Sequence, residues 1–507
     1  MKKTIFGFAI KSIVSNRKEL QELALESLET SEAEVNERLA KCLKNGVAFH
    51  HAGLTSETRK IIEDGFRRNL IKIIVCTPTL AAGLNLPARR VIIKGYRRYD
   101  PNFGMVPIPV LEYRQMAGRA GRPHLDPYGE SVLIAKNEIE FQELKENYIL
   151  AEVEYISSKL KTENALRTHI LSTIVSGLKN KNALMEFMSK TFYAIQYPLE
   201  DIREDIDKVL RFLENTKMLN KEKNNLYPTK LGRLISRLYI DPLSASIILN
   251  GIKDLGNIKV TDLTLLHLIC KTPDMQTLYL RSGDYDWINF FAKEHKKELF
   301  TPEDYEWFLS EVKTASLLQD WISEKNEKDI SSKYKVGPGD IRRIAETAEW
   351  LMHSLAELAS FTRSPYSEPA RTLVTRIRYG ASTELLELIS LRDIGRVRAR
   401  RLYNAGYTNL VALREGNFKE IARLIGPKVA YNVFKQMEVP VEDIEKEFPP
   451  DLSELLTLKG IGNSRAKKLY DAGYISTEAL RKGNFNEIAK IIGTKTAKNI
   501  LKQLKVF

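Results

Sequence analysis

The feature that most constrains this 507-residue chain is an internal duplication near its C-terminus. When the sequence is shifted by 67 residues without a gap, 391–436 aligns with 458–503, and 26 of the 46 aligned pairs are identical. Both copies read apolar–Ile–Gly, then a stretch with Ala and Leu on one side and Arg or Lys on the other, then Tyr-x-Ala-Gly-Tyr. Such a repeat predicts two copies of one small helical unit.

Most of the net positive charge lies in the same part of the chain. The whole chain carries +13, and 391–507 holds 22 basic and 13 acidic residues, a difference of +9. The segment 438–454 holds seven acids and one lysine, so the two copies that flank it are strongly basic. Compact basic blocks favour a polyanionic partner. Taken alone, a solvated cationic surface explains the same charge.

Each copy also places a glycine in a tight turn before a helix, where backbone N–H groups and the helix dipole favour a phosphate. This pattern resembles the helix-hairpin-helix family, which binds DNA backbone without sequence preference. Asp393 stands in the first copy where the second has a glycine, so we expect the first copy to bind phosphate less well. The alternative is a helical packing module with solvated lysines. The DNA-binding residues that the resemblance implies are Gly395, Arg396, Arg398, Gly460, Gly462 and Arg465.

The N-terminal part of the chain alternates helical stretches with short apolar segments. Two of these segments, 71–76 and 90–94, are rich in β-branched residues, and Thr77 directly follows the first. The alternation predicts an α/β fold with a parallel sheet. Open α/β sheets bind ligands at the carboxyl ends of their strands, so Thr77 is a candidate binding residue.

The next landmark is the sequence QMAGRAGR, in which Gln115, Arg119 and Arg122 belong to a Q-x-x-G-R-x-G-R motif. We expect both arginines on a short helix, from which they project to one side and reach a phosphoryl group. The segments HHAGL and TPTLAAGLNLP precede this motif in order along the chain. Chance is a poor explanation for that ordered series.

With these motifs, residues 15–135 resemble the second RecA-like motor domain of superfamily 2 helicases. The motif sequences are most similar to those of the Ski-like branch, specifically the archaeal Hjm-type DNA helicases related to HELQ. The resemblance implies ATP with Mg²⁺ as cofactors and an arginine that stabilises charge on the transferred phosphoryl group. It implies Thr77 as a contact to a DNA phosphate, Gly83 and Asn85 as nucleotide-facing residues, and Gln115, Arg119 and Arg122 as the catalytic residues.

Two motifs of such a motor are missing from the sequence. It contains no G-x-x-x-x-G-K-[ST] loop to cradle phosphates and no Asp-Glu-x-His motif to hold magnesium. In the family both belong to the first RecA domain, which we expect to be supplied in cis or in trans. We therefore predict that this chain alone does not hydrolyse ATP, and that it contains no metal-ligand set of its own.

Two further segments carry expectations about DNA. Residues 95–113, with Asn-Phe-Gly at a turn, predict a β-hairpin. In the family a hairpin here splits the duplex, so Phe103 and Met105 are candidates for stacking on the last base pair; an ordinary surface loop is the alternative. Residues 151–250 predict a winged helix, with its wing at 218–227, which we interpret as a structural hub more than a DNA reader.

Residues 251–385 predict a helical bundle whose clearest helix begins after Gly337-Pro338-Gly339, with Asp340 as its N-cap. Arg343 and Trp350 are seven residues apart and lie on nearly the same face of this helix. A cation and an aromatic ring in line can hold successive nucleotides of a single strand. In the Hjm-type family this helix acts as a ratchet and these positions grip the strand. The alternative places Trp350 in the core.

The predicted fold is an α/β RecA-like domain (1–150) followed by mainly α domains. These are a winged helix (151–250), a helical ratchet bundle (251–385), and tandem helix-hairpin-helix repeats (386–437 and 455–507) joined by an acidic linker (438–454). By resemblance, the chain is the translocation and strand-separation half of an ATP-dependent 3′-to-5′ helicase acting on single-stranded, forked or branched DNA. The alternative is a non-enzymatic branched-DNA binder. No apolar run approaches ~20 residues, and we expect a cytoplasmic, nucleoid-associated monomer without membrane contact.

Overall fold

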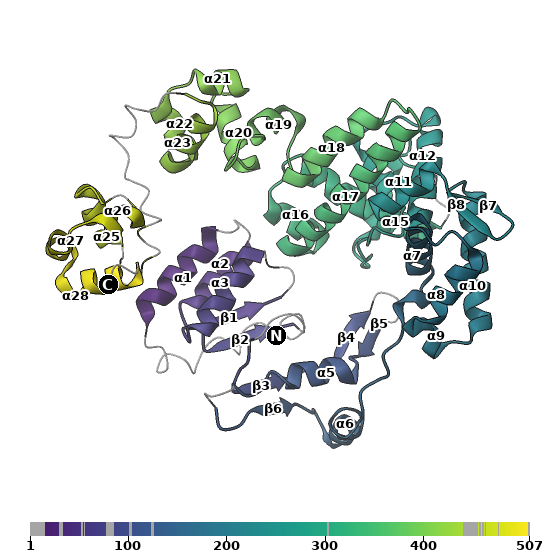
Figure 1. The fold of residues 1–507 in the computed structure, drawn as a ribbon, viewed down its shortest axis with the longest axis horizontal. Coiled ribbons are helices and arrows are strands. Elements are labelled where there is room, and N and C mark those ends of the chain that lie inside the picture. The colour runs from purple at the N-terminus through teal and green to yellow at the C-terminus, as the bar shows by residue number, and fades with distance from the viewer. Residues whose placement is uncertain are drawn as a thin grey trace. The chain divides into compact units, whose positions relative to one another are not determined.

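A computed structural model of the chain divides into two compact units, 1–383 and 384–507, which are described separately here (Figure 1). It describes residues 16–504 except 30–33, 52–53, 55, 78–85, 101–103, 123–125, 302–303, 440–454, 456–457, 459–460, 462 and 475. In that described part, no helix combines the length and hydropathy that a bilayer crossing requires.

The first unit opens with helices packed around a pair of parallel strands. Its elements are α1 (Arg17–Glu29), α2 (Glu34–Leu43), β1 (Val47–His50), α3 (Ser56–Arg67) and β2 (Ile73–Cys76). β1 and β2 run parallel, with Val47 opposite Ile73 and His50 opposite Cys76. Buried side chains such as Leu39, Ala48 and Ile62 form the core between strands and helices. The predicted α/β arrangement is confirmed here.

A second parallel pair, β3 (Arg90–Ile93) with β6 (Glu130–Leu133), follows along the chain. Between its strands lie the antiparallel hairpin of β4 (Arg97–Asp100) and β5 (Gly104–Pro107), which confirms the predicted hairpin, and the helix α5 (Val110–Ala117). After β6 come α6 (Glu138–Leu144) and the π-helical turn η1 (Lys145–Ile149). Tyr148 fixes this part because its hydroxyl donates to the carbonyl of Ile108 at 2.8 Å.

The next region is helical and carries one small hairpin. Its elements are η2 (Lys159–Lys161), α7 (Glu163–Val175), α8 (Lys181–Ser189), α9 (Phe192–Gln196), α10 (Leu199–Asn215), β7 (Leu219–Glu222), β8 (Asn225–Pro228) and α11 (Lys230–Leu238). β7 and β8 are antiparallel, with Leu219 opposite Pro228, so the hairpin predicted at the wing is present. Arg167 ties this region to the next through a bidentate ion pair with the buried Asp241 (2.9 and 2.7 Å).

A helical bundle completes the first unit. It consists of α12 (Pro242–Asp254), η3 (Leu255–Asn257), α13 (Asp262–Cys270), α14 (Tyr285–Glu294), α15 (Tyr305–Ile322), α16 (Glu327–Tyr334), α17 (Pro338–Phe361) and α18 (Ser367–Tyr379). The apolar stripe of α17, which includes Ile341, Ala348 and Leu355, is buried. The predicted N-cap is wrong: Gly337 is the N-cap, and Asp340, three residues later, accepts from the Gly337 N–H at 3.0 Å.

The second unit repeats one set of helices at the predicted shift of 67 residues. After η4 (Thr383–Leu385) and α19 (Leu386–Ile389), the first copy has α20 (Arg396–Asn404), α21 (Leu410–Arg414), α22 (Phe418–Ile425) and α23 (Pro427–Gln436). The second has α25 (Asn463–Asp471), α26 (Thr477–Lys482), α27 (Phe485–Ile492) and α28 (Thr494–Gln503). A tyrosine-to-glutamate hydrogen bond also repeats, from Tyr407 to Glu420 (3.1 Å) and from Tyr474 to Glu487 (2.9 Å).

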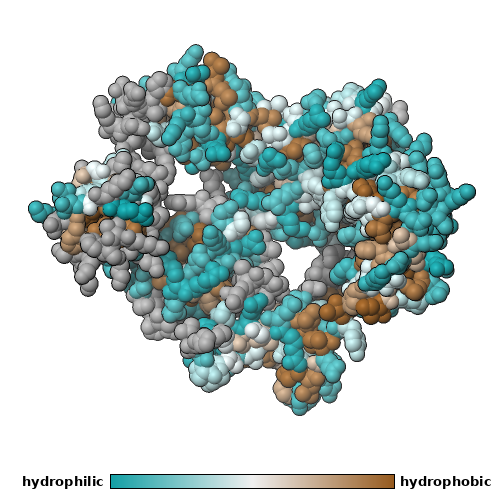
Figure 2. Space-filling model, viewed as in Figure 1, coloured by the Kyte–Doolittle hydropathy of each residue, from teal (hydrophilic) through white to brown (hydrophobic). Residues whose placement is uncertain are grey.

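Several apolar side chains of the first unit stay exposed. Figure 2 shows apolar colour gathered over α6 and over the α8–α9 segment. Ile139 of α6 is 75% exposed and Ile195 of α9 is 80% exposed, and Phe187 and Phe192 are each 45% exposed. Exposed apolar patches of this kind mark contact surfaces in many proteins.

Candidate nucleotide and DNA-binding sites

Arg119 and Arg122 lie on a loop, which corrects the prediction that a short helix carries them. α5 ends at Ala117. The chain then runs beside Ala88, whose N–H donates to the Arg119 carbonyl (2.9 Å) and whose carbonyl accepts from the Gly121 N–H (2.8 Å). Gly121 has φ +93°, a backbone conformation that residues other than glycine rarely adopt, so the backbone turns between the two arginines.

The neighbouring helix fixes the start of this loop. Gln115 is exposed on α5, and the adjacent Arg114 donates to the carbonyls of Ile149 (2.9 Å) and Ala151 (3.2 Å). Gln115, Arg119 and Arg122 are therefore presented by one helix end and one anchored turn. Their side chains are polar or cationic, as a phosphate-binding surface requires.

Arg122 is held by a carboxylate that the sequence analysis missed. Its Nε and Nη2 donate to the two oxygens of Asp126, each at 2.8 Å, and its backbone N–H donates to Oδ2 at 3.2 Å. These hydrogen bonds raise the pKa of the Arg122 guanidinium and lower the pKa of Asp126. The i,i+4 spacing of opposite charges was the signal in the sequence. Arg122 is oriented by this pair, and a bound phosphate would have to share or replace it.

Gly129 is a second residue that the sequence analysis missed. A Cβ at this position would lie 2.3 Å from the Gly121 nitrogen and 2.5 Å from the Ala120 carbonyl oxygen. Real Cβ atoms do not approach backbone so closely, so only glycine fits. The start of β6 therefore presses against the arginine loop and limits its movement.

Thr77 lies where the sequence predicted, one residue beyond β2. Its side chain is exposed, and its backbone N–H donates to the carbonyl of His50 at 3.1 Å. His50 itself is buried beside Glu63 (3.2 Å), and burial lowers its pKa. Gly83 and Asn85 lie outside the described residues.

The hairpin candidates are only partly described. Met105 belongs to β5 and pairs with Tyr99 of β4, one pair away from the turn, so it lies near the tip of the hairpin. The side chain of Met105 and the whole of Phe103 lie outside the described part of the structure. The contact that the two residues make stays a prediction.

On α17, Arg343 and Trp350 occupy different surroundings. Arg343 is exposed, and its guanidinium donates to the side chain of Gln276 at 2.5 Å. Trp350 is half-buried, packs against the core of the first unit, and donates from Nε1 to the carbonyl of Leu238 at 3.0 Å. Trp350 thus has a packed side, as the alternative interpretation requires, and a side open to solvent.

In the first helix-hairpin-helix copy, the turn before α20 is open. Gly395 is the N-cap of α20, and a Cβ there would meet no atom within 4 Å. Asp393 has φ +69°, a conformation in which Asp is tolerated. Its carboxylate accepts from the Asn432 amide (3.1 Å), and its carbonyl accepts from Arg398 (2.8 Å). The negative charge of Asp393 is therefore fixed at the turn.

The remaining DNA-binding candidates differ in how exposed they are. Arg396 is half-buried and Arg398 is exposed at the start of α20, and Arg465 is exposed at the equivalent place in α25. Gly460 and Gly462 lie outside the described residues. Among the residues that are described, no group of three or more His, Cys, Asp or Glu side chains could hold a metal ion.

Four family models match the chain in order. A helicase conserved C-terminal domain matches 11–124, a helix-turn-helix domain matches 129–220, an archaeal helicase domain 4 matches 263–380, and a SAM-like helix-hairpin-helix tandem matches 385–436 and 452–505. The arginine loop, the wing hairpin, α17 and the duplicated unit each fall within or beside one of these ranges.

Three similar proteins carry the same name. The ATP-dependent DNA helicase Hel308 of Methanocella arvoryzae is 50% identical to this chain over 459 residues. The Hel308 proteins of Caldivirga maquilingensis and Pyrobaculum calidifontis are 38% and 41% identical to it, respectively. The chain is similar in sequence to these Hel308 proteins. These alignments cover 88, 84 and 82% of this chain but only 62, 59 and 59% of the relatives. The chain thus spans about three fifths of the length of the Hel308 proteins that it matches.

Proposed function

We propose that this chain is the translocation and strand-separation part of an ATP-dependent 3′-to-5′ DNA helicase of the Hjm type. It acts on forked or branched DNA in replication-fork repair and recombination. The observation that carries the proposal is the anchored loop with Arg119 and Arg122, inside a chain whose four family matches follow one another as helicase and DNA-binding modules.

The ATP site of this helicase is shared with a first RecA domain, in cis or in trans. That domain brings the phosphate-cradling loop and the carboxylate that holds Mg²⁺ with ATP. This chain contributes Gln115, Arg119 and Arg122, with Gly83 and Asn85 at the nucleotide. These residues suit ATP chemically, because two guanidinium groups on a loop that turns at a glycine can bind the oxygens of a triphosphate. The exposed Phe187, Phe192 and Ile195 offer an apolar surface on which such a domain can pack.

The test is strand separation on forked substrates. We expect the chain, mixed with a first RecA domain from a Hel308 relative, to unwind a fork with a 3′ single-stranded tail in the presence of ATP and Mg²⁺. A fork with only a 5′ tail is the matched control and should stay paired. Equal unwinding of both forks would contradict the proposed direction.

The second candidate function is a non-enzymatic branched-DNA binder. The basic, duplicated helix-hairpin-helix unit supports it, because such a unit binds DNA backbone without ATP. Under this alternative the chain binds forks tightly, and no added RecA domain produces unwinding. The retained glutamine and arginines of the ATP-site motif favour the first candidate.

Trp350→Ala should weaken binding of single-stranded DNA by about 1 to 3 kcal/mol, because a base loses its stacking partner. It should also lower the melting temperature, since the half-buried indole and its bond to Leu238 are removed. Trp350→Phe is the matched variant, because it keeps a ring but loses the Nε1 hydrogen bond, worth about 1 kcal/mol. Fluorescence anisotropy with oligo-dT and thermal unfolding measure both effects. A large stability loss in both variants with unchanged affinity would exclude a strand grip.

A further inference from the structure

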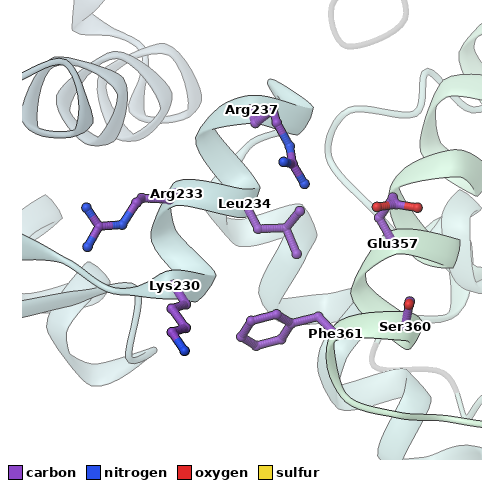
Figure 3. A pocket seen from close by; sticks show the side chains of 7 residues that line it. All are labelled: Lys230, Arg233, Leu234, Arg237, Glu357, Ser360 and Phe361. Carbon is purple, nitrogen blue, oxygen red and sulfur yellow. The ribbon is translucent and has the colours of Figure 1, made fainter.

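A basic pocket lies between α11 and the C-terminal end of α17. Lys230, Arg233, Leu234 and Arg237 line it from α11, and Glu357, Ser360 and Phe361 line it from α17, around a cavity of about 380 Å³. Figure 3 shows Lys230 and Arg237 on either side of Leu234, with the ring of Phe361 directed toward α11 and Arg233 extending away from it. Cations and an aromatic ring thus face one space.

The charges of this pocket are not balanced locally. Within the described part of the chain, no carboxylate forms an ion pair with Lys230, Arg233 or Arg237. Glu357 is the acid in the lining, and its carboxylate is 3.5 Å from Arg371 instead. Like charges along one helix repel each other. An anion placed between Lys230 and Arg237 would relieve that repulsion.

Phe361 decides which kind of anion fits. Its side chain is 45% exposed although it ends a long, well-packed helix. An exposed ring beside cations suits a base next to a phosphate, because the base stacks on the ring while the cations neutralise the backbone. An acidic peptide would satisfy Lys230 and Arg237 but would leave the ring unused.

The pocket continues the face of α17 that carries the proposed strand grip. Arg343, Trp350 and Glu357 follow one another at seven-residue intervals, and Phe361 lies one turn further. Trp350 donates to Leu238, the residue after Arg237, so the grip and the pocket adjoin. At 1.5 Å per residue, Phe361 is roughly 16 Å from Trp350 along the helix axis.

We propose that this pocket is a second contact for the single strand, in which Lys230 and Arg237 bind phosphates and Phe361 stacks a base. It receives nucleotides of the strand that Arg343 and Trp350 grip. The inference rests on the proposed function, because it extends the path of the same strand. It adds a contact between the wing-bearing region and the end of the ratchet helix.

Lys230→Gln with Arg237→Gln tests the phosphate contact. Affinity for oligo-dT is measured across a salt series, with oligonucleotides that fill only the Arg343–Trp350 grip and with longer ones. For the long oligonucleotides, the slope of log affinity against log salt should fall by about 1.4, since each lost phosphate contact contributes roughly 0.7. Short oligonucleotides should bind as they do to the unchanged protein. Arg203→Gln with Lys208→Gln on α10 is the matched control with the same charge change.

Phe361→Leu tests the stacking contact, because it keeps apolar bulk and removes the ring. It should weaken binding of long oligonucleotides by roughly fivefold or more, and an abasic site at the matching position should abolish the difference. Equal salt slopes for the pocket pair and the α10 control would overturn the proposal. An acidic peptide that binds through Lys230 and Arg237 while oligonucleotides do not would also overturn it. If Trp350→Ala also leaves oligonucleotide affinity unchanged, the proposed function fails as well. If Trp350→Ala lowers the affinity but the pocket variants do not, only this inference fails.

Discussion

Arg122→Ala should lower DNA-stimulated ATP turnover by roughly 10³- to 10⁵-fold once a first RecA domain is supplied. That is the range that an arginine acting on a transferred phosphoryl group contributes. Arg122 is held by Asp126 before any nucleotide binds, and a bound phosphate shares or replaces this carboxylate as its partner. Phosphate release from ATP, measured with saturating forked DNA, gives the turnover. DNA affinity should change little.

A control variant must distinguish the effect of losing a catalytic group from the effect of losing an ion pair that stabilises the fold. Arg90→Ala is suitable, because Arg90 belongs to the same domain and pairs with Glu130 on the strands β3 and β6. It removes an arginine–carboxylate pair, more exposed than that of Arg122 and Asp126, without touching the motif. Turnover within a few-fold of the unchanged protein is expected. A comparable loss in both variants would show that Arg122 acts on the fold and not on ATP.

Without the first RecA domain, the purified chain should show no ATP turnover above that of its Arg122→Ala variant. The arginines then have no cradled phosphates and no magnesium on which to act. Turnover by the unchanged chain that disappears in the variant would mean that this chain completes the site itself.

Local patterns in the sequence predicted much of the fold. The duplication predicted matching helices in the second unit, and the structure contains them. The turn signals at 95–113 and 218–227 predicted two hairpins, and both are present. In α17, apolar residues recur at helical spacing along the sequence, and those at Ile341, Ala348 and Leu355 are buried. These features depend on neighbours along the chain, which is why their sequence signals are reliable.

Most of what the sequence analysis missed at the site has one physical cause, which is contact between segments that are apart in the sequence. The spacing of Arg119 and Arg122 looks helical, but two backbone hydrogen bonds with Ala88, one donated and one accepted by it, hold that segment in a turn. The close approach of Gly129 to Gly121 likewise joins separate parts of the chain. At Trp350, the sequence allowed a core residue or a strand grip, and the bond to Leu238, more than a hundred positions away, gives the indole a packed side. Periodicity contains no information about such partners.

Asp340 is a different kind of error, because it concerns two local interactions that compete. Its side chain suits an N-cap, but Pro338 is favourable in the first helical turn and draws the helix start back to Gly337. Asp340 then serves the same helix end from within it, by accepting from the Gly337 N–H. The residue was assigned to the correct helix end and the wrong position.

Deleting 455–507 should weaken binding to branched DNA by roughly ten- to a hundredfold at moderate salt, because several backbone contacts are lost together. The second copy has its own core, which includes Leu469, Leu480 and Ile500, so its removal should leave the first unit folded. Affinity is measured on forked duplexes of two unrelated sequences across a salt series. Both forks should lose affinity equally.

Point variants then compare the two copies at equivalent positions. Gly462→Asp should reproduce most of the effect of the deletion, whereas Gly395→Asp should cost much less, because the fixed charge of Asp393 already weakens the first turn. Asp393→Gly should strengthen binding, since it removes that charge at a backbone position, φ +69°, which glycine adopts freely. An ineffective deletion, or a difference above about tenfold between the two fork sequences, would show that the second copy is not a backbone-binding module. Docking of another protein would then be the better explanation of its basic surface.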